Sequence, residues 1–264
     1  MGLGFPEGTE WSGARKIARL LRSISGGDVL DVGTGRGDFI ETMAVFLADY
    51  TSFTGIDPDG EELEEAMERL EGMPVQLVAM DGVDMTFGDD RFDTVGISYS
   101  LHHLERVEDV LEEMRRVLRP GGAFILQEMF SDGEQTPAQE TDIMVANWST
   151  RIDRLLGKYH REMYTREEIR SFIDGLGLRD VTVVETARYV DCLTCEDRAR
   201  CEDPLDPGTV KDRLEDIEDD LERLESIPDR ELASALAEEG RAFIDRIGTV
   251  GTRPASIMFA VGRK

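Results

Sequence analysis

VLDVGTGRG, residues 29–37, joins an apolar run to three glycines that are each separated by one residue. Asp31 lies inside the run, and a helical pattern begins directly after it at Asp38. Glycines at such a turn let the main chain bend sharply and approach a ligand where a Cβ atom would collide. The stretch is typical of a strand that delivers backbone to a nucleoside-containing cofactor. A purely structural turn in an α/β protein is the alternative.

The glycine spacing narrows the class of cofactor. The dinucleotide motif G-x-G-x-x-G places its third glycine for close helix–strand packing, with the pyrophosphate at the helix N-terminus. In this chain the third glycine, Gly37, comes one residue earlier, and Asp31 and Asp38 flank the turn. Their negative charge would repel a pyrophosphate, whereas it suits an amino or hydroxyl group. Hydride chemistry with a dinucleotide is therefore the less favoured interpretation.

Predicted strands and helices alternate along the chain. Such βαβ units with right-handed crossovers build a doubly wound, mostly parallel sheet that binds ligands beyond the carboxyl ends of its strands. Polar residues stand at these ends: Asp31, Asp57, Asp81 and Ser98. The predicted strands are 29–32, 53–56, 75–80, 92–98, 123–127, 178–184 and 255–261.

The composition of the chain indicates which binding partners and which cellular compartment to expect. The 264 residues carry 56 acidic and 30 basic side chains, a net charge of −26. Such a surface repels nucleic acid and anionic membranes, so we expect neither as a partner. The shortage of lysine is typical either of a salt-rich cytoplasm or of a GC-rich genome. Because the chain shows neither a transmembrane-length apolar stretch nor a signal-peptide pattern, we expect a cytoplasmic protein.

Five motifs together resemble the class I S-adenosylmethionine-dependent methyltransferases, in the branch of small-molecule and quinone methylases. In chain order they are VLDVGTGRG (29–37), GIDPD (55–59), MDGVDMTF (80–87), FDTVGISYSLHHL (92–104) and VLRPGGAFILQE (117–128). The resemblance implies a Rossmann-like, doubly wound, seven-stranded sheet of order 3-2-1-4-5-7-6, with the last strand antiparallel. The chain itself adds a helical insert before that last strand. The resemblance also implies methyl transfer from S-adenosylmethionine to a small-molecule acceptor.

The resemblance further implies which residues bind the cofactor. Asp31 and the glycine loop would hold the methionine part, and Asp57 would bind the ribose hydroxyls. Pro58 would flank the adenine, Asp81 would accept from the adenine amine, and Ser98 would line the methyl-donor pocket. The full expected set is Asp31, Gly33, Thr34, Gly35, Gly37, Asp57, Pro58, Asp81, Gly82 and Ser98.

Candidate catalytic residues follow the fourth predicted strand. Methyl transfer depends mainly on alignment of nucleophile, methyl and sulfur, and it needs a general base only if the acceptor must lose a proton. His102 and His103 stand at the pocket rim and are the candidates; a packing pair at a helix start is the alternative. Trp11 and Trp148 either close over a ligand or belong to the core.

Three cysteines, Cys192, Cys195 and Cys201, form an odd, clustered set that does not predict a disulfide framework. Their spacing leaves open a zinc ion or an iron–sulfur cluster, a redox pair, or inert thiols. Three thiolates would also suit a trivalent arsenical. The alternatives to small-molecule methylation are therefore arsenite methylation, or a metal- or iron–sulfur-binding protein for cofactor sensing or assembly.

We expect one methyltransferase domain, either monomeric or homodimeric. The predicted helices 207–224 and 229–247 form either a solvated hairpin or a substrate lid or dimer contact. The expected divisions are a single domain over 1–264, a cofactor-binding core at 25–130, a lid or substrate segment at 131–164 and a cysteine-containing helical insert at 190–252.

Overall fold

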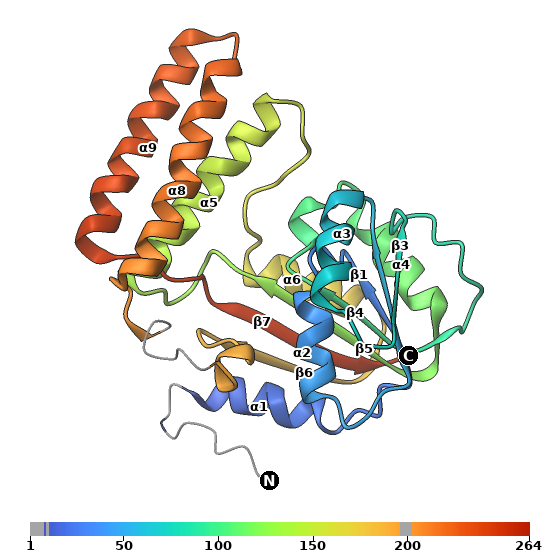
Figure 1. The fold of residues 1–264 in the computed structure, drawn as a ribbon. Coiled ribbons are helices and arrows are strands. Elements are labelled where there is room, and N and C mark those ends of the chain that lie inside the picture. The colour runs from blue at the N-terminus through green and yellow to red at the C-terminus, as the bar shows by residue number, and fades with distance from the viewer. Residues whose placement is uncertain (1–7, 9–10, 196–201) are drawn as a thin grey trace. The chain divides into compact units, whose positions relative to one another are not determined.

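The structure is a computed structural model that describes residue 8 and residues 11–195 and 202–264. It divides into two compact units (Figure 1). Unit 1 contains the chain up to Glu128 together with Glu167–Leu193 and Ile257–Lys264. Unit 2 contains Met129–Arg166 and Thr194–Ser256. The functional division into core, lid and insert stays a prediction.

Unit 1 is organised around a seven-stranded sheet of order β3-β2-β1-β4-β5-β7-β6. The first five strands pair in parallel, and β7 runs antiparallel to β6. This confirms the expected Rossmann-like fold class and strand order. The strands are β1 Asp28–Val32, β2 Ser52–Asp57, β3 Val75–Ala79, β4 Phe92–Ser98, β5 Leu118–Met129, β6 Arg179–Thr186 and β7 Ile257–Arg263.

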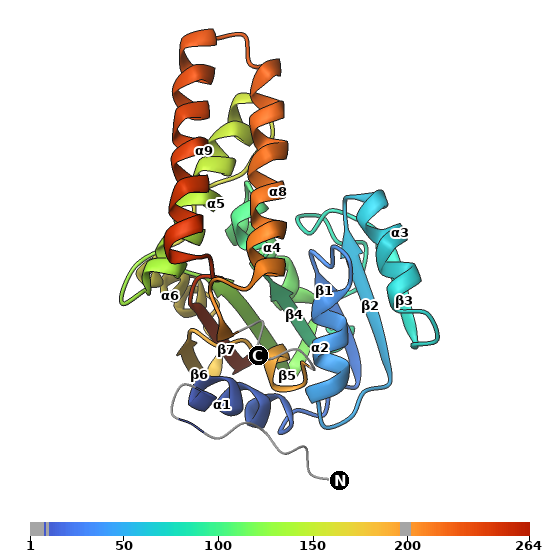
Figure 2. The same cartoon turned by 60° about the vertical axis from the view of Figure 1, so that its left-hand side comes forward.

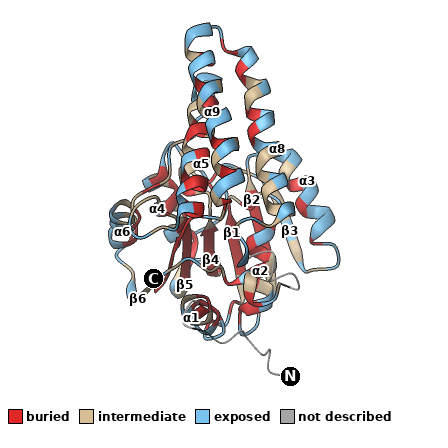
Figure 3. Ribbon diagram, turned by 90° about the vertical axis from the view of Figure 1, so that its left-hand side faces the viewer, coloured by how far each residue is buried: buried red, intermediate tan, exposed pale blue. Residues whose placement is uncertain are grey.

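Helices cover the sheet of unit 1 because the central strands are apolar on both faces, as is usual for parallel sheets. Figure 3 shows the buried strands against the exposed outer sides of the helices. Helix α4 illustrates the pattern, since Val107, Val110 and Met114 are buried at three- and four-residue spacing. The helices of unit 1 are α1 Ser12–Leu21, α2 Asp38–Phe46, α3 Gly60–Arg69, α4 Val107–Val117 and α6 Arg166–Gly175.

The fifth strand is longer than the sequence pattern predicts. It begins at Leu118, whereas the prediction was 123–127 with a turn before it. The register against β4 shifts between Phe92 and Thr94, and Gly121 has a φ of 82°. The Pro-Gly-Gly segment is therefore an irregularity within the pairing of β4 and β5, and the strand continues on both sides of it.

The long helices in the described part of unit 2 are α5 Pro137–Leu155, α8 Pro207–Arg223 and α9 Arg230–Val250. Helices α8 and α9 form a hairpin that packs on α5 (Figure 2). Trp148 of α5 lies in the resulting core and donates from Nε1 to the carbonyl of Leu236 at 3.0 Å. A Cβ on Gly240 would lie 2.7 Å from the Trp148 ring, so this glycine allows α9 to approach. Trp148 is a core residue.

Buried carboxylates of α5 are paired with arginines of α8. Asp142 accepts from Arg213, and Asp153 accepts from Arg223. Asp153 also lies 2.6 Å from Nδ1 of His160. Although burial opposes it, the hydrogen bonds from His160 and Arg223 lower the pKa of Asp153 below its usual value.

Within the described part of the chain, every helix is too short or too polar to cross a membrane.

Candidate active site

The glycine loop turns the chain between β1 and α2 through left-handed backbone. Gly33, Gly35 and Gly37 have φ values of 68°, 49° and 87°, which glycine adopts without strain. A Cβ on Gly33 would lie 2.4 Å from Oγ of Ser100, whereas a Cβ on Gly35 would have no neighbour closer than 3.8 Å. Any larger residue at position 33 would therefore collide with Ser100, whereas the backbone at Gly35 is open to a ligand.

Asp31 is a buried carboxylate next to this loop. Its side chain is inaccessible to solvent, and neither oxygen has a hydrogen-bond partner in the described parts of the chain. Burial, with a smaller contribution from the charge of Asp57, raises the pKa of Asp31 to about 8. The nearby Thr34 side chain lowers the pKa of Asp31 by more than Asp57 raises it, but burial outweighs both. In the structure the Thr34 hydroxyl donates to the Asp31 main-chain carbonyl at 3.1 Å. A cationic group placed here would supply the missing partner.

Asp57 lies at the end of β2 and holds the glycine loop in place through a hydrogen bond. Its Oδ2 accepts from the Gly35 amide and its Oδ1 from the Asp59 amide, both at 2.9 Å. Each carboxylate oxygen can accept a second hydrogen bond, so a pair of ligand hydroxyls can still be bound. Pro58 and Glu61 border an open hollow beside it.

Asp81 and Gly82 follow β3. Asp81 is exposed, and its Oδ1 accepts from the Val83 amide at 3.0 Å. Gly82 is buried, and a Cβ there would lie 3.0 Å from the Val110 side chain. Thus the turn presents a carboxylate at the same edge of the sheet as Asp57.

The ends of β4 and β5 bring together polar residues that the sequence analysis partly missed. Ser98, an expected residue, accepts from Nε2 of Gln127 at 3.2 Å. Oε1 of Gln127 is buried and has no partner among the residues described. Ser100 was not predicted, and its hydroxyl donates to the carbonyls of Gly33 at 3.1 Å and Ser98 at 3.0 Å. The end of β4 is thereby tied to the glycine loop.

His102 is oriented by a residue that was also missed. Its Nδ1 lies 3.2 Å from Oε1 of Glu128, which is buried at the end of β5. Oε2 of Glu128 accepts from the Leu101 amide at 2.9 Å, so the carboxylate is fixed. His103 is exposed, although its ring lies 4.3 Å from that of His102. A histidine held by a carboxylate has the arrangement of a general base, and this favours His102 over His103.

Two expectations outside the strand ends have different outcomes. Trp11 is buried beneath the guanidinium of Arg188, 5.0 Å above its ring, and is a core residue. Cys192 and Cys195 are both partly buried, and Cys201 lies outside the described residues. The proposed zinc or iron–sulfur ligands therefore stay a prediction.

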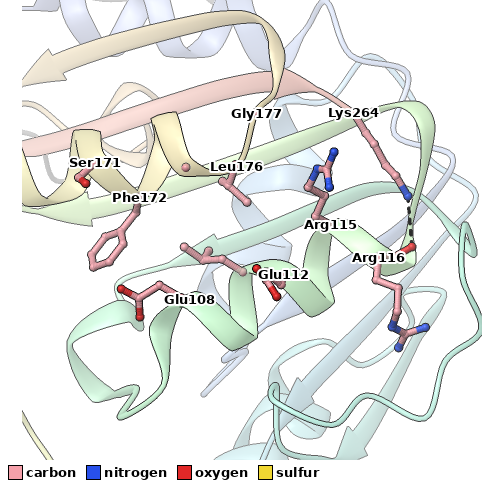
Figure 4. Close-up of a pocket in the computed structure, with 11 residues that line it drawn as sticks. Glu108, Glu112, Arg115, Arg116, Ser171, Phe172, Leu176, Gly177 and Lys264 are labelled. Atoms are coloured by element: carbon pink, nitrogen blue, oxygen red, sulfur yellow. Dashed lines mark hydrogen bonds between the residues drawn. The ribbon is translucent and has the colours of Figure 1, made fainter.

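A groove of about 840 Å³ lies elsewhere in unit 1, between α4 and α6. Figure 4 shows Glu108 and Glu112 of α4 facing Phe172 of α6, with Arg115 and Lys264 toward one end. None of the expected cofactor residues lines it. This groove is therefore separate from the strand-end site.

The fold is similar to that of solved structures described as methyltransferases, and part of the chain matches a family of methyltransferase domains. Residues 30–126 match the protein family described as a methyltransferase domain. Its relatives include a ubiquinone/menaquinone biosynthesis C-methyltransferase of Geotalea daltonii, 30% identical over 46% of this chain and 53% of that protein. A demethylmenaquinone methyltransferase of Thermotoga maritima is 24% identical over 65% of this chain and 73% of that protein.

The chain is also similar to proteins with other named activities. A sterol 4-C-methyltransferase of Caenorhabditis elegans is 33% identical over 45% of this chain and 36% of that protein. The chain thus spans about half the length, or less, of the first two curated relatives it matches. Among solved structures, the [4+2]-cyclase SpnF has a TM-score of 0.57 at 18% identity, covering 99% of this chain and 86% of that one. This likeness shows the fold alone.

Proposed function

We propose that the protein transfers a methyl group from S-adenosylmethionine to a small-molecule acceptor. The observation that carries the proposal is Asp31, a fully buried carboxylate with no partner for either oxygen in the described chain, beside a glycine loop. A ligand that brings an ammonium and a sulfonium into an acid-rich rim fits this site electrostatically. The comparisons support the class of reaction, because the relatives reported above are named as methyltransferases.

The residues that would hold the cofactor are those of the strand ends. Asp31 would accept from the ammonium, and the open backbone at Gly35 would lie against the methionine part. Asp57 would accept from the ribose hydroxyls, with Pro58 beside the adenine and Asp81 accepting from its amine. When bound, the cofactor supplies a methyl carbon that is already activated by the sulfonium. The remaining contribution of the chain is alignment and proton removal.

His102 is the proposed general base. Since Nδ1 faces the buried Glu128, Nε2 would be the nitrogen that takes the proton. It would remove the proton of an acidic O–H or N–H group of the acceptor. The acceptor's electron pair then forms the bond to the methyl carbon, and the pair of the broken carbon–sulfur bond remains on sulfur. We propose an acceptor with such a proton, as in the reduced ring of a demethylmenaquinone, the compound that names the activity of the Thermotoga maritima relative.

Cofactor binding tests the proposal directly. Isothermal calorimetry with S-adenosylmethionine should show binding to the wild-type protein and at least a tenfold loss of affinity in Asp31→Asn. Asp174→Asn changes an exposed carboxylate of α6 in the same way and should bind normally. Absence of binding to the wild-type protein would exclude the function. The alternatives built on the cysteines, arsenite methylation or metal-dependent assembly, gain no support from the described residues.

A further inference from the structure

Tyr99 holds an unusual backbone conformation at the end of β4. Its φ is 51°, in the left-handed region that a bulky residue rarely adopts. The Tyr99 amide donates to the Gln127 carbonyl at 3.0 Å, so pairing with β5 keeps the residue in place. Strain of this kind persists where the surrounding structure maintains it, and it clusters at sites that bind ligands.

The hydroxyl of Tyr99 is a second, independent peculiarity. It is buried, and it has no hydrogen-bond partner in the described parts of the chain. Burial, with the acidic neighbours Asp191 and Glu128 and the phenol of Tyr189, raises the pKa of Tyr99 well above 10, so the phenol stays protonated. A buried hydroxyl that lacks a partner is unfavourable, and natural structures rarely keep one without a role.

The ring of Tyr99 lies beside a second aromatic ring. Its centroid lies 5.7 Å from that of Tyr189, at an interplanar angle of 56°. The residue directly follows Ser98 and precedes Ser100, which contacts the glycine loop. Glu128, the partner of His102, is also close enough to affect its phenol. Tyr99 therefore lies among the residues proposed to bind the cofactor and to remove the acceptor's proton.

We infer that Tyr99 is a specificity-determining contact for the methyl acceptor, and that its hydroxyl donates a hydrogen bond to an oxygen on a planar ring lying against Tyr99 and Tyr189. The inference rests on the proposed methyl transfer and names the class of its acceptor, an oxygenated aromatic ring. A neutral phenol in an acidic neighbourhood is suited to donate to a phenolic or carbonyl oxygen. Such a bond would also stabilise negative charge that develops on that oxygen when the acceptor loses its proton.

Tyr99→Phe tests the contact because it removes only the hydroxyl. Binding of 1,4-dihydroxynaphthalene would be measured anaerobically by saturation-transfer NMR in the presence of S-adenosylhomocysteine, with naphthalene as the analogue without oxygen. We expect the variant to bind the dihydroxy compound about tenfold more weakly than wild type and naphthalene equally well. The melting temperature without ligand should be unchanged or higher, since the hydroxyl removed has no protein partner.

Tyr50→Phe is the matched control, because Tyr50 precedes β2 at the opposite end of the sheet. It should bind both compounds as wild type does. Equal binding of the dihydroxy compound by wild type and Tyr99→Phe, or a lowered melting temperature with unchanged binding, would overturn the inference. Wild type that binds S-adenosylmethionine but not the dihydroxy compound would overturn it too, and would leave methyl transfer standing. Wild type that does not bind S-adenosylmethionine would instead exclude the proposed function.

Discussion

Replacing Asp31 should make the protein more stable and less able to bind its cofactor. Burial raises the pKa of Asp31 from 3.8 to about 8, so the folded state holds a proton that the unfolded state releases. Stability contributed by this group is therefore complete below pH 3.8 and is lost as the pH rises toward 8. Since one pKa unit corresponds to about 1.4 kcal/mol, the whole shift is worth about 6 kcal/mol.

About half of that loss falls in an accessible pH range. Between pH 5.5 and pH 8.5 the linkage relation predicts that Asp31 lowers the free energy of unfolding by about 3 kcal/mol. Asp31→Asn should not show this loss, because its amide does not ionise. At pH 8.5 wild type has lost nearly all of the ~6 kcal/mol that the pKa shift is worth, whereas Asp31→Asn loses none of it. The unsatisfied amide of the variant costs ~2 kcal/mol, so the variant should be more stable than wild type by about 3 kcal/mol.

Urea unfolding without cofactor, at both pH values, measures these differences. Asp174→Asn serves again as the control, and its pH dependence should follow that of wild type. The reasoning would be refuted if Asp31→Asn lost as much stability between the two pH values as wild type does. A second requirement is that the same concentration of S-adenosylmethionine stabilises wild type at pH 8.5 more than it stabilises Asp31→Asn.

Three further changes probe the loop, the base and the helical unit. Gly33→Ala places a Cβ 2.4 Å from the Ser100 hydroxyl, so calorimetry should show affinity for S-adenosylmethionine falling at least tenfold; unchanged affinity would contradict the loop's role. Glu128→Gln should keep the contact with the Leu101 amide but weaken the orientation of His102, so kcat should fall about tenfold and the acidic limb of its pH profile, where a general base becomes protonated, should move. An unaltered profile would remove His102 as the base. Trp148→Ala should lower the free energy of unfolding by about 3–5 kcal/mol in urea titrations, and a loss below 1 kcal/mol would show that the core of unit 2 does not depend on this ring.

Much of the sheet could be predicted because each strand is a local apolar run that ends in a polar residue. Asp31 and Asp57 stand at such ends, so their place at one rim follows from the parallel topology. Tyr99 and Glu128 could not be singled out in the same way. Their roles depend on the pairing of β4 with β5, and on whether a buried atom finds a partner, which a linear pattern does not record.

In unit 2 as well, helices could be predicted from local sequence patterns, but contacts between residues far apart in the sequence could not. Periodicity predicted the hairpin of α8 and α9, but the packing of Trp148 on α9 joins residues 88 positions apart. The start of α5 is marked by a local signal. Thr136 and Gln139 form a capping box just before and within the first turn, and the spacing T-x-x-Q is readable from sequence.

The Ser100 hydroxyl links two loops that the proposals assign to different ligands. It joins the loop after β4, which carries Tyr99 and His102, to the carbonyl of Gly33 in the glycine loop. A displacement of either loop on binding is therefore transmitted to the other through one bond. Binding of donor and acceptor would then be cooperative, and reciprocity requires each ligand to change the affinity of the other by the same factor.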